Sequence, residues 1–299
     1  MNTRRTHLDG LAISLLLVCC LFWGGQQVLV KATLSEVPAV TQAALRFIGS
    51  ALTLWLWCRV RKIPLWQADG SFRAGLLAGV LFSAEFVCMY LGLKYTSASR
   101  LTIFLYTAPF WVALLLPLWL KQERMRPLQW LGLGLAFGAS AFALRDGLIH
   151  SLGRDLAWLG DLLAVAAGAF WGLTTVVIRA SRLSSLSPEK VLFYQVAISA
   201  VVLPFVAWGL GEQPTLAISG FAWLSLFLQT FVGAFASYLT WMWMLSHYPA
   251  TKISVFVFLT PIFALLFGTL WLGETLTPGL AAALIGVAVG IVLVNRKSA

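Results

Sequence analysis

The sequence LFWGGQQVLVKA at residues 21–32 returns half a chain later as AFWGLTTVVIRA at residues 169–180. Both segments contain Phe-Trp-Gly, then a valine four residues further on, and end in alanine. The basic residue before that alanine is Lys31 in the first copy and Arg179 in the second. A pair of glutamines in the first copy is replaced by a pair of threonines in the second. This recurrence predicts that the chain contains an internal structural repeat.

The composition is that of a membrane protein. Of the 299 residues, 60% are hydrophobic and only 11% are charged, whereas a soluble domain has about 25% charged residues. The net charge of +10 would suggest nucleic acid as the partner of a soluble protein. Here the basic residues lie between apolar runs. We therefore expect membrane lipid, at the anionic cytoplasmic leaflet, and no nucleic acid.

Apolar segments follow one another along the whole chain, each about 17–25 residues long, which is the length that a bilayer core requires. They lie at 11–30, 38–57, 74–93, 99–120, 128–144, 160–178, 190–209, 219–243, 249–272 and 278–294. The sequence thus predicts an all-α integral membrane protein with ten transmembrane helices.

The basic residues are distributed unevenly between the two sides of such a bundle. With the N-terminus in the cytoplasm, most of the 21 Lys and Arg residues fall in cytoplasmic segments. The exceptions are Lys31, Lys94, Arg100, Arg145 and Arg154 on the outer side and Arg46 inside a helix. This asymmetry predicts a multi-pass protein with both termini in the cytoplasm.

The opening repeat is one of several that follow in the same order and at nearly constant spacing. Residues 46–51 align with 195–200, and ASRLTIFLYTAPF at 98–110 aligns with ATKISVFVFLTPI at 250–262. These matches predict two domains of five helices, 1–147 and 148–299. Because five is odd, the second copy enters the membrane inverted, which is an arrangement found in many secondary transporters. We expect a central cavity near the midplane, between the two copies.

Two glycine pairs also correspond, Gly134-x-x-x-Gly138 in the first copy and Gly286-x-x-x-Gly290 in the second. Small residues at this spacing allow helices to approach closely. We expect both pairs to serve packing, either within the chain or at the face of a homodimer.

Several segments resemble the EamA repeat of the drug/metabolite transporter superfamily. They include WGGQQVLVK (23–31), LRFIGSAL (45–52) and PLQWLGLGLAFGASAFAL (127–144), with FWGLTTVVIRA (170–180) in the second copy. The resemblance extends over nearly the whole chain. It implies a ten-helix transporter with a central cavity that exports amino acids or other small metabolites. Since some bacterial members export amino acids, it also implies the bacterial inner membrane.

Two charged residues, Arg46 and Glu85, lie well inside predicted helices, and a charge at a helix centre costs about 2.5–3.5 kcal/mol on insertion scales. Glu85 lies near the middle of the third helix, and its counterpart in the second copy is Ser237. Glu85 is a candidate for proton coupling or for binding a substrate ammonium, and Arg46 for binding a carboxylate by two parallel hydrogen bonds. The alternative is a structural pair between Arg46 and Glu85, or a neutral carboxyl.

Polar and aromatic residues of the first and sixth helices are candidates for the cavity wall. Trp23, Gln27 and Lys31 are four residues apart and so share one helix face. We expect Trp23 and Trp171 to face each other across the cavity and Lys31 and Arg179 to be interface anchors. The wall positions that we expect in these two helices are Trp23, Gln26, Gln27, Trp171, Thr174 and Thr175.

Further candidates for substrate binding are Tyr90, Tyr106, Gln195, Tyr238 and Trp241. Aromatic residues at helical spacing are as often packing residues, so both interpretations stay open. Pro109 and Pro261 occupy equivalent positions inside the fourth and ninth helices. Each removes a backbone hydrogen bond, so the pair predicts either gating hinges or fixed bends.

The sequence contains no catalytic constellation, no metal-ligand spacing among its cysteines and no phosphate-binding loop. We therefore expect neither an enzyme nor a bound cofactor or metal. Three hypotheses follow. The first is a secondary exporter of small polar metabolites, above all amino acids, that works by alternating access. The second is a proton-coupled exporter of aromatic or cationic drugs that uses Glu85. The third is a membrane scaffold or sensor that transports nothing.

Overall fold

The computed structural model describes residues 5, 7–92, 95, 96, 98–143, 145, 156–213, 217–272 and 278–296. Within these residues the chain is helical and contains no strand. The first part of the chain forms α1 (Gly10–Ala32), α2 (Ala39–Val60), α3 (Phe72–Gly92), α4 (Ala98–Leu105), α5 (Ala108–Leu115), η1 (Leu116–Leu118), η2 (Lys121–Glu123) and α6 (Pro127–Ala143).

The second part of the chain repeats this order. It forms α8 (Ala157–Ala180), η3 (Arg182–Ser185), α9 (Pro188–Gly209), α10 (Gly220–Phe227), the π-helix η4 (Leu228–Ser237), α11 (Tyr238–His247), α12 (Ala250–Ser254), η5 (Val255–Phe258), α13 (Leu259–Leu272) and α14 (Pro278–Asn295). The remaining η elements are short 3₁₀ helices.

Seven helical stretches of the described residues are long and apolar enough to cross a membrane. They are Gly10–Val30, Ala39–Val60, Phe72–Gly92, Leu101–Leu118, Ala157–Ala180, Pro188–Gly209 and Gly220–His247. The other three expected segments are also helical, as α6, as the series from α12 to α13, and as α14. A multi-pass membrane protein is thus supported, whereas the full set of ten spans stays a prediction.

Several helices begin where a polar side chain precedes an apolar run. Asp9 Oδ1 accepts a hydrogen bond from the Ala12 backbone N–H at 2.9 Å, at the start of α1. The hydroxyl oxygen of Ser219 accepts one from the Ala222 N–H at 3.1 Å, at the start of α10. These caps satisfy N–H groups that have no partner inside the helix.

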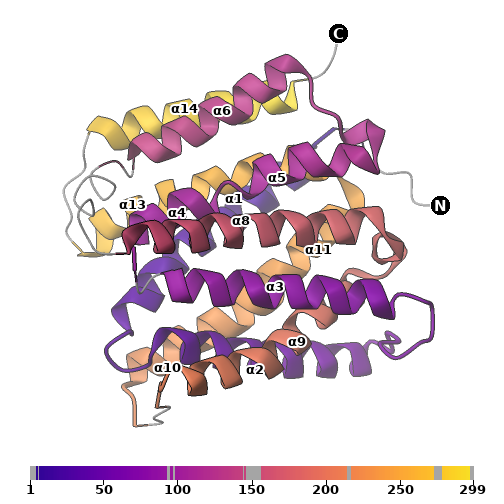
Figure 1. Cartoon of the computed structure of the whole chain (residues 1–299), viewed down its shortest axis with the longest axis vertical. Helices are drawn as coiled ribbons and strands as arrows, with labels where there is room; N and C mark the ends of the chain where they lie inside the picture. Colours follow the sequence, from indigo (N-terminus) through magenta and orange to yellow (C-terminus); the bar gives the residue numbers. More distant parts are fainter. Residues whose placement is uncertain are drawn as a thin grey trace.

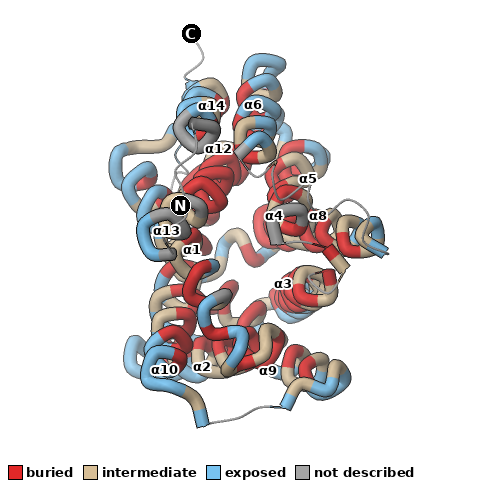
Figure 2. Tube along the Cα trace, turned by 90° about the vertical axis from the view of Figure 1, so that its left-hand side faces the viewer, coloured by how far each residue is buried: buried red, intermediate tan, exposed pale blue. Residues whose placement is uncertain are grey.

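The helices pack as a bundle of roughly aligned rods (Figure 1). The most extensive contacts join α6 to α14, α3 to α8, α2 to α9, α3 to α9 and α1 to α13. Buried positions line the sides of the helices that face one another, while exposed positions lie outside (Figure 2). The exposed surface includes Val201, Phe205 and Trp208 on α9. An apolar exterior of this kind suits contact with lipid chains rather than with water.

The two glycine pairs play different roles. A Cβ atom at Gly290 would lie 2.6 Å from the Gly132 carbonyl oxygen, and one at Gly286 would lie 2.7 Å from the Ala139 Cβ. The second pair therefore lies at the close contact of α14 with α6, as predicted. Gly134 and Gly138 do not pack within the chain, since a Cβ at either would meet nothing within 4 Å, and for them the alternative of a homodimer face stays a prediction. On α6 it is Gly132, two residues earlier, that makes the close contact.

The expected interruptions of the fourth and ninth helices are present. The chain leaves α4 at Leu105 and begins α5 at Ala108, so Pro109 lies in the first turn of α5. Pro261 is the third residue of α13, directly after the 3₁₀ turn η5. Proline is tolerated in a first helical turn because its missing N–H would have no partner there. Whether these interruptions move as hinges stays a prediction.

Candidate functional site

Aromatic side chains from four elements meet in one cluster, which we call the first ring cluster. Its members are Trp23 from α1, Phe47 from α2, Phe82 and Phe86 from α3, and Tyr238 and Trp241 from α11. The Trp23 ring lies 6.2 Å from Tyr238 and 5.7 Å from Trp241, edge to face. Tyr90 extends the cluster along α3, 6.3 Å from Phe86. The structure therefore brings together four of the predicted site residues, Trp23, Tyr90, Tyr238 and Trp241.

A hydrogen bond fixes the Trp23 ring against the π-helix. Its indole Nε1–H donates to the Ser237 hydroxyl oxygen at 2.8 Å, and the Ser237 hydroxyl donates to the Gly233 carbonyl at 2.5 Å. The indole donor is therefore already used within the chain. The Ser237 hydroxyl, at the position that corresponds to Glu85, connects α1 with η4.

Arg46 and Glu85 lie beside this cluster and are buried, with 3% and 6% of their surface exposed. The Arg46 guanidinium lies over the rings of Phe47 and Phe86, at 4.7 and 5.2 Å from their centroids. Its Nε and Nη2 atoms have no hydrogen-bond partner, and neither has Glu85 Oε2. In the described part of the chain no ion pair joins the two side chains. The structural pair considered from the sequence is therefore not a direct contact, although the Arg46 charge acts on the Glu85 carboxyl. The alternative of a neutral Glu85 carboxyl stays a prediction.

Tyr106 and Trp171 belong to a second ring cluster. Tyr106, between α4 and α5, lies 5.8 Å from Trp171 on α8 and 6.5 Å from Phe258 in η5. Phe137 of α6 lies 6.0 Å from Phe258. Among the described residues no ring contact joins Trp171 to Trp23, so the two tryptophans lie in separate clusters. Their placement on opposite walls of one cavity stays a prediction.

A shallow crevice borders the second ring cluster and is too narrow to hold a water molecule. It is lined by Thr102, Ile103, Tyr106, Phe137, Ser140, Ala141 and Pro261. Two predicted site residues, Tyr106 and Pro261, thus share one crevice. A central cavity between the two copies stays a prediction.

The two glutamines of α1 differ in their surroundings. Gln26 lies against Gly233 of the π-helix, in the space that a Cβ at Gly233 would fill, and its Oε1 atom is buried without a partner. Gln27 is exposed. The structure therefore buries the Gln26 amide oxygen against the π-helix, whereas the Gln27 side chain is exposed. Whether the helix face that Trp23 and Gln27 share lines a cavity stays a prediction. The side chain of Lys31, which we predicted as an anchor, lies outside the described residues.

The two threonines of α8 are buried, but their hydroxyls are used within that helix. Thr174 donates to the Phe170 carbonyl at 2.8 Å, and Thr175 donates to the Trp171 carbonyl at 3.2 Å. These bonds satisfy the polar groups without any ligand. The difference between the Gln pair and the Thr pair is therefore that only Gln26 has an unsatisfied buried polar atom.

Gln195 occupies in α9 the position that Arg46 occupies in α2. Its Nε2 donates to the Val191 carbonyl at 3.1 Å and to the Met242 sulfur at 3.3 Å. Gln195 thus ties α9 to α11, and its amide donors have partners within the chain. Arg46 and Gln195 differ in this respect, and the positive charge is present in one copy only.

The interpretation of Arg179 as an interface anchor is wrong. Its guanidinium is buried and pairs with Glu123 at 2.5 Å, while a second nitrogen donates to the Leu245 carbonyl at 2.6 Å. Glu123 also accepts hydrogen bonds from the backbone N–H groups of Ala250 and Thr251 at 3.1 and 3.2 Å. The pair therefore joins η2, α8 and α11 to the start of α12. Sequence reasoning missed Glu123, which stands in a short loop among basic residues.

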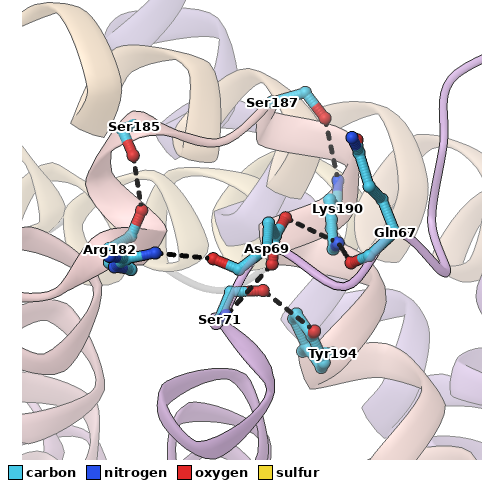
Figure 3. Close-up of polar contacts among 8 residues, drawn as sticks. All are labelled: Gln67, Asp69, Ser71, Arg182, Ser185, Ser187, Lys190 and Tyr194. Carbon is cyan, nitrogen blue, oxygen red and sulfur yellow. Dashed lines mark hydrogen bonds and ion pairs between the residues drawn. The ribbon is translucent and has the colours of Figure 1, made fainter.

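A second charged cluster lies at the end of the bundle where α3 and α9 begin (Figure 3). Lys190 Nζ donates to Asp69 Oδ2 at 2.8 Å and to the Gln67 carbonyl at 2.9 Å. The backbone N–H of Ser71 donates to Asp69 Oδ1 at 3.0 Å, and Arg182 donates to the Asp69 carbonyl at 2.9 Å. This cluster ties the loop before α3 to η3 and α9.

Replacing Asp69 with asparagine should destabilise the chain in a pH-dependent way. Hydrogen bonds from Lys190 and Ser71 hold the pKa of the Asp69 carboxyl well below its usual range. A carboxyl whose pKa is lower in the folded state than its unfolded value of 3.8 stabilises the fold at pH values above 3.8. This contribution is lost as the pH falls below that value. The melting temperature of Asp69→Asn should be lower than that of wild type at pH 7, and the difference should narrow below pH about 4. A difference that is the same at every pH would contradict this role.

Among the described residues no group of His, Cys, Asp and Glu is arranged to hold a metal ion. The polar atoms without partners that belong to predicted site residues are instead those of Gln26, Arg46 and Glu85. They are suited to hydrogen bonds with an organic ligand.

Comparisons with known proteins agree with this membrane fold. The family model of the EamA-like transporter family matches twice, at residues 10–145 and 158–296. An uncharacterized transporter of Synechocystis is 30% identical over 92% of this chain and 87% of its own length. A probable amino-acid metabolite efflux pump of Salmonella typhimurium is 24% identical over 88% of this chain and 87% of its own length.

A solved crystal structure resembles the fold with a TM-score of 0.78, over 96% of this chain and 99% of that one. Its sequence is only 18% identical, so the likeness concerns the fold alone. The family model accounts for nearly the whole described chain in two successive matches, and the described helices follow the same order in both. The chain belongs to the EamA-like transporter family.

Proposed function

We propose that this chain is a secondary transporter that exports small polar metabolites, first of all amino acids, by alternating access between two inverted five-helix copies. The proposed copies are residues 1–147 and 148–299. The role is transport rather than catalysis. The relatives named as transporters and amino-acid metabolite efflux pumps support this proposal.

The observation that carries the proposal is the exchange of packing partners between the two copies. Counterpart helices pair directly, α2 with α9 and α6 with α14. Other contacts are exchanged between the copies. α3 packs on α8 and α9, which are the counterparts of α1 and α2. η4, the counterpart of α3, packs on α1 and α2. Likewise α5 packs on α8, and α13 packs on α1. These exchanges support a two-fold relation between the copies, as in transporters built from inverted repeats.

The exchanged contacts are unequal in extent. α3 packs along α8 much more extensively than η4 and α11 pack on α1. If the copies are related by two-fold symmetry, the structure departs from that symmetry at this interface. Such a departure is what a rocking mechanism requires, since one interface closes while its counterpart loosens.

We further propose that the protein lies in a bacterial inner membrane with both termini in the cytoplasm. The end at which α3, α6 and α9 begin would then be cytoplasmic. It includes the exposed Arg59, Arg61, Lys62 and Arg73. Basic residues near the ends of membrane helices favour the cytoplasmic side.

The proposal is tested by counterflow in liposomes that contain the purified chain. Vesicles that contain the chain and are loaded with one unlabelled solute should transiently accumulate the same solute in labelled form. Loaded liposomes without the chain should not. The panel consists of amino acids, amines and organic acids. Accumulation of amino acids alone is the expected result. Accumulation of aromatic amines would favour the drug-export alternative, and no accumulation of any solute would overturn transport.

A further inference from the structure

The strongest unexplained feature of the core is the set of unsatisfied polar atoms on Arg46 and Glu85. A buried polar atom without a hydrogen bond is unfavourable, and a buried charge without a partner is more so. Both side chains are more than nine-tenths buried and lie on neighbouring elements, α2 and α3. Because no ion pair joins them in the described part of the chain, each retains hydrogen-bonding capacity that the protein does not use.

The unsatisfied atoms of Arg46 are a particular pair. Nε and Nη2 form one edge of the planar guanidinium, and their N–H bonds point the same way. Two parallel donors on one edge fit the two oxygens of a carboxylate. A single unpaired donor could bind many kinds of ligand, whereas this edge specifies a planar anion such as a carboxylate.

The unsatisfied atom of Glu85 is the carboxyl oxygen Oε2, which accepts hydrogen bonds when the carboxyl is ionised. The Arg46 guanidinium lies over the ring of Phe86 on α3, and its charge acts on the Glu85 carboxyl of the same helix. The anion-binding edge and the acceptor therefore lie in one region. A ligand ammonium is the natural partner for a buried carboxylate oxygen, because it supplies N–H donors together with the opposite charge.

We propose that Arg46 and Glu85 form a two-point site for the zwitterionic end of an α-amino acid. Arg46 binds the carboxylate through Nε and Nη2, and Glu85 binds the ammonium. The first ring cluster, which adjoins both groups, gives the substrate side chain an apolar surface. This inference rests on the proposed transport function and specifies the substrate chemistry of that transporter.

Charge balance gives this site its selectivity. A zwitterion neutralises Arg46 and Glu85 at once and brings no net charge into the core. An amine leaves the charge of Arg46 without a partner, and a carboxylic acid without the ammonium leaves Glu85 without the cation that favours its ionised form. Because a buried charge without its partner is strongly unfavourable, each such analogue should bind at least about 30-fold more weakly than the amino acid.

The experiment measures ligand binding by thermal stabilisation of the purified full-length chain. Each standard amino acid is tested first. The amino acid that stabilises the chain most is then compared with its amide, which lacks the carboxylate, and with its deamino acid, which lacks the ammonium. We expect wild type to bind both analogues at least about 30-fold more weakly than the amino acid.

Two variants then separate the two points of contact. Arg46→Gln should bind the amino acid and its amide about equally, while Glu85→Gln should bind the amino acid and its deamino acid about equally. Arg59→Gln removes a charge from the exposed surface of the same helix, and it should keep the full preference for the zwitterion. If Arg46→Gln does not fold, Arg46→Lys keeps the charge without the two-donor edge and should still lose preference for the carboxylate.

The outcomes distinguish this inference from the transport proposal. If wild type binds both analogues as well as the amino acid, or if the two variants keep its preference, the two-point site is wrong. If no amino acid binds but amines or organic acids show counterflow, the site is wrong and transport stands. If amino acids bind as predicted and no solute shows counterflow, the site stands and transport is wrong.

Discussion

Replacing Glu123 with glutamine should lower the free energy of unfolding by about 3–5 kcal/mol, because it leaves the charge of Arg179 buried without its partner. Only 3% of the Arg179 side chain and 1% of the Glu123 side chain are exposed. Glu123 also accepts hydrogen bonds from the N–H groups of Ala250 and Thr251 and from the Thr251 hydroxyl. The same substitution therefore weakens the start of α12. The measurement is the unfolding of the purified chain in detergent.

The double variant Glu123→Gln/Arg179→Met is the control for the charge effect. Removing both charges takes away the unpaired group, so the double variant should be more stable than Glu123→Gln alone. A double variant as unstable as the sum of the two single variants would show that the pair itself contributes little. The hydrogen bonds to α12 would then account for the whole effect of Glu123.

Replacing Gly24 with alanine should be the second most disruptive change, at about 1–3 kcal/mol. A Cβ atom at Gly24 would lie 2.8 Å from the backbone nitrogen of Ala264 and 2.9 Å from the carbonyl oxygen of Thr260. Because these are backbone atoms, no side-chain rotation can relieve the overlap, and α1 and α13 must move apart. Unfolding in detergent measures this effect directly.

The matched control is Gly134→Ala, in α6. A Cβ there would meet nothing within 4 Å, and alanine is a better helix former than glycine. We therefore expect Gly134→Ala to be neutral or slightly stabilising. Equal losses of stability in the two variants would mean that helix propensity or lipid contact, rather than the approach of α1 and α13, decides the result.

The helical segments were predictable from sequence because a bilayer core imposes both length and hydropathy. The interruptions near Pro109 and Pro261 followed from proline chemistry, and both are present. The rotation of each helix about its own axis was not predictable. In lipid, the outward and inward faces are both apolar, so the hydrophobic pattern does not say which face is buried. The sequence therefore did not reveal that Gln27 is exposed, or that Gly132 rather than Gly134 makes the close contact.

The pairing of charges was also beyond the sequence pattern. Glu123 and Arg179 are far apart in the chain and meet only because the loop after α5 returns to the end of α8. From the sequence, Arg179 was interpreted as an interface anchor and Glu123 was not singled out at all. Arg46 and Glu85 suggested a structural pair as readily as a binding site, and only the orientation of α2 and α3 shows that their polar atoms are left unsatisfied. Side-chain partners thus depended on three-dimensional packing that no local signal encodes.

The pairing of α6 with α14 makes the two parts of the chain depend on each other. Gly132 and Ala136 on α6 meet Gly290 on α14, and these two helices make their most extensive contact with each other. A chain cut between α6 and α8 would leave this small-residue face uncovered, as it would the face of α2 that packs on α9. The close helix contacts that hold a membrane bundle together would then be missing from both fragments. Neither fragment expressed alone should therefore fold stably, whereas the two fragments expressed together should reassemble.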